Sequence, residues 1–151
     1  MAKQLWIMRH GDAAWVAGKD AERPLTDAGR HQVRTVAEQL KSQLKGTCDV
    51  WISPYLRAQQ SAQELLDAAQ IEPANTQTEP MITPSGDPVM VASLIEASDF
   101  ENLIIVAHMP LVARLTSYLT RNDSVEGFYT AQIAQLKQKS EMWEHQRDWR
   151  P

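Results

Sequence analysis

The sequence predicts a single α/β domain over residues 1–151, in which a mostly parallel central sheet is flanked by helices on both faces and carries an antiparallel C-terminal hairpin at its edge. Apolar or β-rich segments alternate with segments of helical periodicity, which is typical of parallel strands joined by helical crossovers. Residues 103–107, Leu-Ile-Ile-Val-Ala, are continuously apolar, as expected of a central strand covered on both faces. The alternation stops after residue 129, where two β-rich segments follow one another directly.

The expected strands are short runs of apolar and β-branched residues bounded by polar or turn-forming ones. Those of the parallel part are expected at residues 4–8, 50–52, 76–81 and 102–107. The hairpin is expected to pair residues 130–136 with residues 141–146 around a turn at residues 137–140. Because a helix separates each parallel strand from the next, the carboxyl ends of these strands are expected to share one edge of the sheet.

The first helix is expected over residues 26–44, where Thr26 can cap the amino end and Asp27 suits the first turn. Its apolar residues recur at helical spacing: Val33, Val36, Ala37, Leu40 and Leu44. The second helix is expected to begin at Ser53-Pro54, with the serine as cap and the proline at the first helical position.

The third helix is expected over residues 89–97, because Asp87-Pro88 repeats the same combination of cap and proline just ahead of it. Pro110 is expected to open the fourth helix, whose apolar stripe is formed by Leu111, Leu115 and Leu119. With 43% hydrophobic residues, a chain of this length can bury one substantial core.

Composition excludes several functional classes. The net charge of −4 disfavours a general nucleic-acid-binding protein, which usually carries a basic face, although a few arginines in one pocket can still bind an anion. No apolar stretch approaches the length of a membrane span, and no signal peptide is evident at the amino terminus. Cys48 is the only cysteine, so no internal disulfide is expected and a reducing, cytoplasmic location is favoured.

Basic residues follow three of the expected parallel strands at their carboxyl ends. Arg9, His10 and Gly11 follow the first strand, Arg57 lies in the first turn of the helix after the second, and His108 follows the fourth. Arginine presents a planar fork of donors that fits phosphate, neutral histidine is a nitrogen nucleophile, and glycine permits close approach of the backbone. The carboxyl edge of such a sheet is where α/β proteins place ligand sites.

Each of these residues also has a purely structural interpretation. A cation near a helix amino end is mildly unfavourable unless an anion faces it. Beside two histidines and a second arginine, Arg57 is therefore better explained by an anion site than by an exposed arginine whose aliphatic stem covers apolar surface. His108 alone is compatible with a structural or metal-binding group. The chain has no HxH, no HExxH and no cysteine pair, so no metal site is expected. His31 and His145 lie in polar stretches and are not expected to act.

The tryptophans divide into two groups. Trp6, Trp51 and Trp143 lie in expected strands and are predicted to be core residues. Trp15 lies in the loop that follows the Arg-His-Gly triplet, where it either lines the mouth of a pocket or packs the loop.

Three segments in register resemble the histidine phosphatase superfamily, also called phosphoglycerate-mutase-like. They are Arg9-His10-Gly11, the segment Ser-Pro-Tyr-Leu-Arg-Ala at residues 53–58, and His108 after an apolar strand. A closer similarity is to the small SixA-type phosphohistidine phosphatases, in the stretches at residues 7–14, 23–26, 83–87 and 108–112. The resemblance implies the phosphoglycerate-mutase-like fold and transfer of a phosphoryl group first to a histidine and then to water, with no cofactor.

The resemblance also implies the roles of the site residues. His10 would be the nucleophile, and its other ring nitrogen would donate to a fixed acceptor. Arg9 and Arg57 would clamp the phosphoryl oxygens together with a protonated His108. Arg23 matches a family arginine that reaches the pocket. Gly11 completes the expected substrate-binding set.

The sequence departs from the larger family members in lacking a clear general acid, since Glu79, Asp87 and Glu96 all lie outside the usual context. A phosphohistidine substrate tolerates this loss best, because its imidazole departs readily once protonated. The chain also lacks an insertion long enough to form a lid. The expected substrate is therefore the phosphohistidine of a phosphotransfer or phosphocarrier protein, acted on by a monomer. The alternatives are a small-molecule phosphomonoesterase and an inactive phosphoprotein-binding module.

Overall fold

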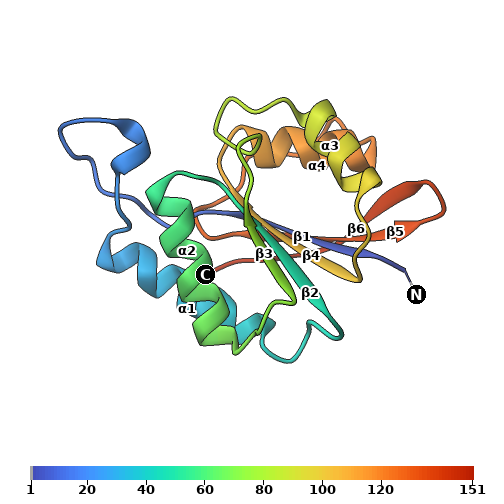
Figure 1. The fold of residues 1–151 in the computed structure, drawn as a ribbon, viewed down its shortest axis with the longest axis horizontal. Coiled ribbons are helices and arrows are strands. Elements are labelled where there is room, and N and C mark those ends of the chain that lie inside the picture. Colours follow the sequence, from blue (N-terminus) through green and yellow to red (C-terminus); the bar gives the residue numbers. More distant parts are fainter. Residues whose placement is uncertain (1) are drawn as a thin grey trace.

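A six-stranded mixed sheet, in the order β3-β2-β4-β1-β5-β6, organises the computed structural model, which describes residues 2–151 (Figure 1). The parallel strands are β1 (Gln4–Arg9), β2 (Cys48–Ile52), β3 (Asn75–Thr78) and β4 (Asn102–Ala107). The last two strands, β5 (Ile133–Lys139) and β6 (Met142–Trp149), form an antiparallel hairpin, and β5 pairs with β1. The predicted fold class is confirmed.

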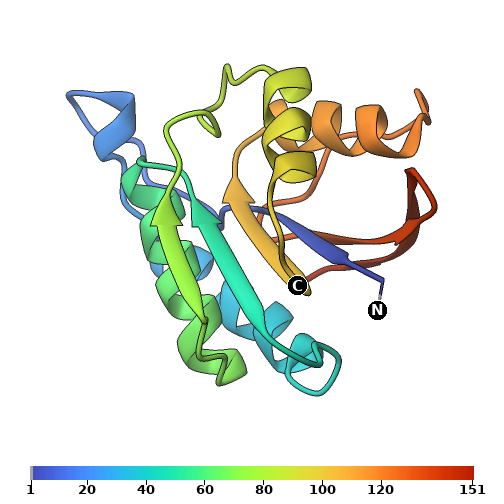
Figure 2. The same ribbon diagram turned by 45° about the vertical axis from the view of Figure 1, so that its right-hand side comes forward.

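Helices cover both faces of the sheet (Figures 1 and 2). One face carries α1 (Asp27–Leu40) and α2 (Leu56–Ala69), and the other carries α3 (Pro88–Ala97) and α4 (Leu111–Thr120). The segment between β1 and α1 contains a short 3-10 turn, η1 (Asp20–Glu22), and projects from the body beside α2 in both views. Within residues 2–151, no helix is long and apolar enough to cross a membrane.

Two hydrophobic clusters form the core, one on each face of the sheet. Side chains alternate along β1, so that Leu5 and Ile7 pack in the cluster under α3 and α4, while Trp6 and Met8 pack in the cluster under α1 and α2. Every residue of β4 is buried, as the continuous apolar run predicted. The prediction that Trp6, Trp51 and Trp143 are core residues is also confirmed.

The predicted start of the second helix is wrong. The helix α2 begins at Leu56 with Tyr55 at its cap position, so neither Ser53 nor Pro54 belongs to it. The reason is a competing partner: the Ser53 hydroxyl is fully buried and lies 2.6 Å from His108 Nε2, and it also accepts from Tyr55 N (3.3 Å). The other caps agree with the sequence, because Thr26 caps α1, and Asp87 caps α3 ahead of Pro88.

Other boundaries shift by a few residues. The helix α1 ends at Leu40 instead of residue 44, because the chain turns there to reach Gly46, whose φ of 93° leads into β2. The strand β3 stops at Thr78, before Pro80, which has no N–H to donate to a ladder. The hairpin turn is tighter than expected, and β6 continues to Trp149, whose side chain joins the core under α1 and α2.

The loop after β1 is packed against the first turn of α1 through two glycines. A Cβ built on Gly11 would lie 2.7 Å from Gly29 O, and one built on Gly29 would collide with Asp12 O and lie 2.9 Å from Asp12 N. The contact is therefore backbone against backbone, with no room for a side chain on either residue. It fixes the loop that carries His10 onto a helix whose apolar face packs in the core.

The substitution Gly29→Ala is expected to lower the free energy of unfolding by about 1–3 kcal/mol. Helix propensity alone would raise the free energy of unfolding by about 1 kcal/mol, so a decrease would show that the backbone contact outweighs helix propensity. Urea unfolding monitored by circular dichroism measures the effect. Ala28→Gly, at the exposed neighbouring position, serves as the scale for helix propensity. A Gly29→Ala protein more stable than the wild type would contradict the packing described here.

Candidate active site

The carboxyl ends of β1 and β4 hold His10 in place. β1 ends at Arg9, whose N–H donates to Gln132 O (3.0 Å). The His10 N–H donates to Ala107 O at the end of β4 (3.0 Å), and His10 O accepts from Ala131 N (2.9 Å). The backbone around this residue is therefore fixed by neighbouring segments, and the imidazole is directed along the carboxyl edge of the sheet.

The His10 ring has one committed nitrogen and one available nitrogen. Its Nδ1 lies 2.6 Å from Gly11 O, and because a carbonyl can only accept, Nδ1 must donate. The Nε2 atom then keeps its lone pair, and it accepts from Arg57 Nε at 3.3 Å. This is the tautomer that a nucleophilic Nε2 requires.

Arg57 lies in the first turn of α2, and its side chain is buried. Its carbonyl accepts from Ser61 Oγ (2.7 Å), and the same hydroxyl accepts from Gly11 N (3.0 Å), which joins α2 to the loop after β1. The guanidinium lies over the Tyr55 ring at 5.0 Å and donates to His10 and to Asp20. These contacts place a fixed cation directly beside the candidate nucleophile.

His108 packs against His10. The two rings are 5.1 Å apart between centroids, and the Tyr55 ring packs edge-on against His108 at 5.0 Å. Its Nε2 is 2.6 Å from the Ser53 hydroxyl, which orients the ring. The sequence placed His10, Arg9, Arg57 and His108 at one sheet edge, and the structure brings them together there.

Burial and neighbouring cations lower the pKa of His10 to about 4, against the effect of its hydrogen bond to Gly11. The cations are Arg57, Arg9 and Arg23, in decreasing order of influence. Because the lowered value lies well below neutrality, His10 is an uncharged imidazole at pH 7. Its Nε2 lone pair is then available to attack an electrophile.

His108 is expected to be protonated when it faces the phosphoryl oxygens, and this expectation stays a prediction. Burial, followed by the influence of His10 and Arg57, lowers the pKa of His108 to about 3, although Asp20 opposes the shift. The imidazole is therefore neutral at pH 7. A phosphoryl dianion held between these cations would favour the charged form of the ring.

Arg9 contributes a second guanidinium. Its Nη1 donates to Phe128 O at 2.7 Å, and burial together with Arg57 lowers its pKa. Among residues 2–151, two buried side-chain nitrogens have no hydrogen-bond partner, and they are Arg9 Nε and His108 Nδ1. Buried polar atoms without partners are costly, and both belong to the candidate site. An anion bound there would supply acceptors.

Arg23 and Gly11 have protein partners that the sequence did not indicate. Arg23 donates to Ala14 O (2.9 Å) and Ala13 O (3.3 Å), pairs with Asp20 and lies over the Trp15 ring at 3.7 Å. Both backbone groups of Gly11 are used, by Ser61 Oγ and by His10 Nδ1. Their expected roles in binding substrate remain predictions.

The acidic residues considered as proton donors are engaged elsewhere. The Glu79 carboxylate is buried and accepts from Met81 N (2.9 Å), and the Asp87 carboxylate caps α3. Glu96 lies in the last turn of α3, beside a hollow that it lines with Lys3 at the other end of β1. The carboxylate that approaches the site is that of Asp20, which the sequence analysis missed because an isolated loop aspartate carries no pattern.

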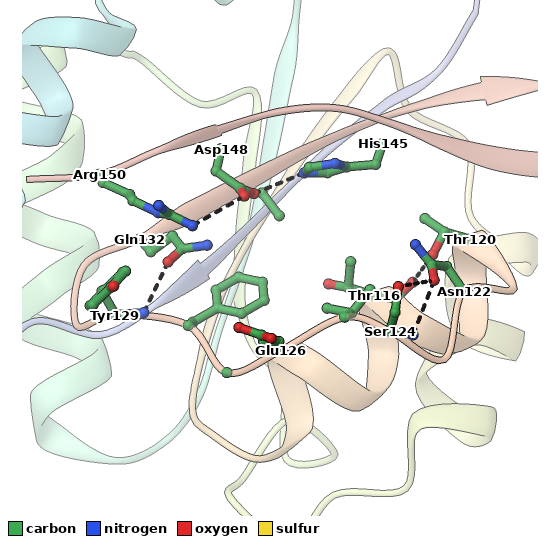
Figure 3. Close-up of a pocket in the computed structure, with 14 residues that line it drawn as sticks. Thr116, Thr120, Asn122, Ser124, Glu126, Tyr129, Gln132, His145, Asp148 and Arg150 are labelled. Carbon is green, nitrogen blue, oxygen red and sulfur yellow. Dashed lines mark hydrogen bonds and ion pairs between the residues drawn. The ribbon is translucent and has the colours of Figure 1, made fainter.

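A cavity of about 540 Å³ lies between the end of α4, the segment at residues 122–129 and the hairpin (Figure 3). Its labelled polar residues include Glu126, Tyr129, Gln132, His145, Asp148 and Arg150. Arg9, His10, Arg57 and His108 do not line it. Across residues 2–151, no group of three or more His, Cys, Asp or Glu side chains is placed to hold a metal ion.

Known proteins share this fold and these segments. The family model of the histidine phosphatase superfamily (branch 1) matches residues 5–79. The phosphohistidine phosphatase SixA of Escherichia coli (strain K12) is 36% identical over 136 residues, which cover 88% of this chain and 84% of the relative. The phosphohistidine phosphatase SixA homolog of Haemophilus influenzae (strain ATCC 51907 / DSM 11121 / KW20 / Rd) is 34% identical and covers 94% of both chains.

A solved structure extends the comparison to three dimensions. The structure of the protein histidine phosphatase SixA complexed with tungstate matches with a TM-score of 0.87 at 32% identity, covering 98% of this chain and 97% of that one. This chain therefore belongs to branch 1 of the histidine phosphatase superfamily and is a homologue of the SixA phosphohistidine phosphatases.

Proposed function

We propose that this protein removes the phosphoryl group from a phosphohistidine on another protein, through a phosphoenzyme intermediate on His10. The observation that carries the proposal is the 2.6 Å contact between His10 Nδ1 and Gly11 O, which leaves Nε2 unprotonated beside Arg57. A neutral histidine with a fixed tautomer, next to the buried guanidinium of Arg57, suits nucleophilic attack on a phosphoryl group.

The charges of the site support an anionic substrate. The chain as a whole is acidic, with a net charge of −4, yet Arg9, Arg57 and Arg23 all act on His10. A local cluster of cations, of which Arg57 is buried, can make the potential positive at this edge of the sheet and is preorganised to stabilise the charge of the transferring group. Tungstate, named in the related SixA structure, is a tetrahedral oxyanion like phosphate.

The reaction has two displacement steps. In the first, the His10 Nε2 lone pair forms a bond to phosphorus as the phosphorus–nitrogen bond of the substrate breaks, and the departing imidazole nitrogen takes up a proton. In the second, water attacks phosphorus, the bond to Nε2 breaks and orthophosphate leaves with the lone pair restored on His10. Arg9 and Arg57 hold the phosphoryl oxygens in both steps.

His108 is proposed to act on the same oxygens. Its Nδ1 is buried without a partner, and a phosphoryl dianion nearby would raise the pKa of the ring and favour a proton there. The protonated ring would then donate to the transferring group. A carboxylic acid is less necessary for this substrate, because imidazole is a good leaving group once protonated, and the proton that it takes up can come from solvent.

A protein-borne substrate is supported by the named relatives and by the sequence. Two relatives are phosphohistidine phosphatases by name. The chain carries no insertion long enough to cover the site as a lid, so a phosphohistidine displayed on a phosphotransfer or phosphocarrier protein is the expected substrate. A monomeric state and a cytoplasmic location remain predictions from the sequence.

Dephosphorylation of a ³²P-phosphohistidine phosphocarrier protein, beside hydrolysis of p-nitrophenyl phosphate, tests the function. The wild type is expected to release ³²P from the protein, and His10→Ala is expected to release none. Arg57→Ala is expected to lower kcat/KM by about a hundredfold or more while the circular dichroism spectrum stays native, because its guanidinium stabilises the transition state. EDTA is expected to leave the rate unchanged.

Three results of this assay would contradict parts of the proposal. Wild-type protein that hydrolyses only the ester, in a His10-dependent manner, would make it a small-molecule phosphomonoesterase. Protein that binds the phosphoprotein without turnover would be an inactive binding module. An unfolded Arg57→Ala protein would show that this arginine acts on the fold.

The protonation state of the site gives a second prediction. In ¹⁵N spectra of the histidine rings, His10 is expected to show the neutral form with its proton on Nδ1 at pH 7, and to titrate near pH 4, because burial disfavours the charged ring. The His10→Gln protein assigns the signals. A titration of the His10 ring near pH 6.5, or a proton on Nε2 at neutral pH, would contradict the geometry.

A further inference from the structure

The Arg57 guanidinium is held from two directions. Its two terminal nitrogens donate to one residue, Nη1 to the Asp20 carbonyl (2.7 Å) and Nη2 to the Asp20 carboxylate (3.2 Å). Its Nε faces His10 Nε2 at 3.3 Å. We propose that Asp20 is a positioning residue for phosphoryl transfer, which holds Arg57 end-on so that the Nε side of the fork faces the nucleophile. The inference rests on the proposed function, in which Arg57 binds the phosphoryl group.

The geometry of arginine explains why one residue is sufficient to set this orientation. The guanidinium is planar and has two faces for paired hydrogen bonds, one formed by the two terminal nitrogens and one formed by Nε with Nη2. Asp20 occupies the first pair through its backbone and its side chain. The second pair then lies toward His10, where Nε and Nη2 would donate together to two oxygens of the phosphoryl group under attack.

Asp20 is itself held in place by a second arginine. One carboxylate oxygen contacts Arg57 and the other contacts Arg23 Nη1, each at 3.2 Å. The remaining donors of Arg23 bind loop carbonyls, and its guanidinium lies against Trp15, whose side chain is 86% exposed. The loop between β1 and α1 is therefore a chain of contacts that runs from Trp15 to the nucleophile.

Two other roles for Asp20 fit the structure less well. As a proton donor it is unsuited, since burial alone would raise the pKa of its carboxyl but the hydrogen bonds from Arg23 and Arg57 outweigh burial and lower it, so the group stays ionised. Asp20 is also unsuited as a carboxylate that takes the place of the phosphoryl group and must be displaced by it, because the Asp20 contacts leave Arg57 Nε directed at His10. Displacement would predict faster catalysis once the carboxylate is removed.

The test compares Asp20→Ala with Glu22→Ala. Glu22 lies in the same 3-10 turn, is exposed, and forms no ion pair within residues 2–151. The substitution Glu22→Ala therefore removes the same charge as Asp20→Ala without removing a contact to Arg57. Asp20→Ala is expected to lower kcat/KM by about tenfold to a hundredfold, mainly in kcat, because Arg57 keeps the contact to the backbone carbonyl but loses the carboxylate contact that completes its orientation. Asp20→Asn, which keeps one acceptor, is expected to recover part of the loss. Glu22→Ala is expected to stay within about twofold of the wild type.

A double-mutant cycle separates action through Arg57 from a general effect. In the Arg57→Ala background, Asp20→Ala is expected to change kcat/KM by less than about twofold, since its partner is already gone. Equal losses in both backgrounds would overturn the proposal. So would a loss confined to KM, a rate equal to that of Glu22→Ala, or a rate above that of the wild type.

The use of two substrates and a spectroscopic measurement makes the outcome independent of the proposed substrate. Both p-nitrophenyl phosphate and a histidine-phosphorylated protein are used, so failure on the protein alone rejects the proposed substrate and leaves the Asp20 comparison intact. In addition, the Arg57 Nε–H resonance in ¹H–¹⁵N spectra of the unliganded protein is expected to move or broaden in Asp20→Ala and to stay in place in Glu22→Ala. An unchanged resonance in Asp20→Ala would overturn the inference.

Discussion

The hydrogen bond from His10 Nδ1 to the Gly11 carbonyl is the interaction on which the rest of the site depends. It selects the tautomer, and it aims Nε2 toward Arg57. The bond persists because the Gly11 backbone cannot move: its N–H is held by Ser61 on α2, and its Cα lies against Gly29 on α1. Two helices and a sheet edge thus converge on one carbonyl, and a small displacement of any of them would turn the imidazole away.

The electrostatics at this edge of the sheet also keep His10 Nε2 available as a nucleophile. Burial lowers the pKa of His10 most, and three arginines add to the effect, so the nucleophile remains uncharged among cations. The same conditions would repel a proton from His108 until an anion is bound. Asp20 offsets part of the positive charge and orients Arg57, so the site combines several cations with one exposed carboxylate.

Much of this arrangement was predictable because it follows from local patterns. The parallel strands carry apolar runs, their ends carry basic residues, and the topology brings those ends to one edge, so Arg9, His10, Arg57 and His108 were placed correctly. The predicted caps Thr26 and Asp87 are also confirmed, although the Thr26 hydroxyl donates to Asp12 as well.

The failures share a physical cause, which is competition from a partner distant in sequence. Ser53 was predicted to cap α2, but its hydroxyl meets His108 across 55 residues. Asp20 carried no pattern, because its importance comes from Arg57, which lies 37 residues away. The pKa of His108 likewise depends on burial and on neighbouring cations, which only the fold reveals.

The most direct test of the central claim is to trap the phosphoenzyme. The protein is mixed with a histidine-phosphorylated phosphocarrier protein, quenched at alkaline pH within milliseconds, and examined by mass spectrometry and ³¹P NMR. The geometry predicts a phosphoryl group on His10, bonded to Nε2. A phosphoryl group on His10 Nδ1, on His108, or on neither histidine while orthophosphate is released, would contradict the account.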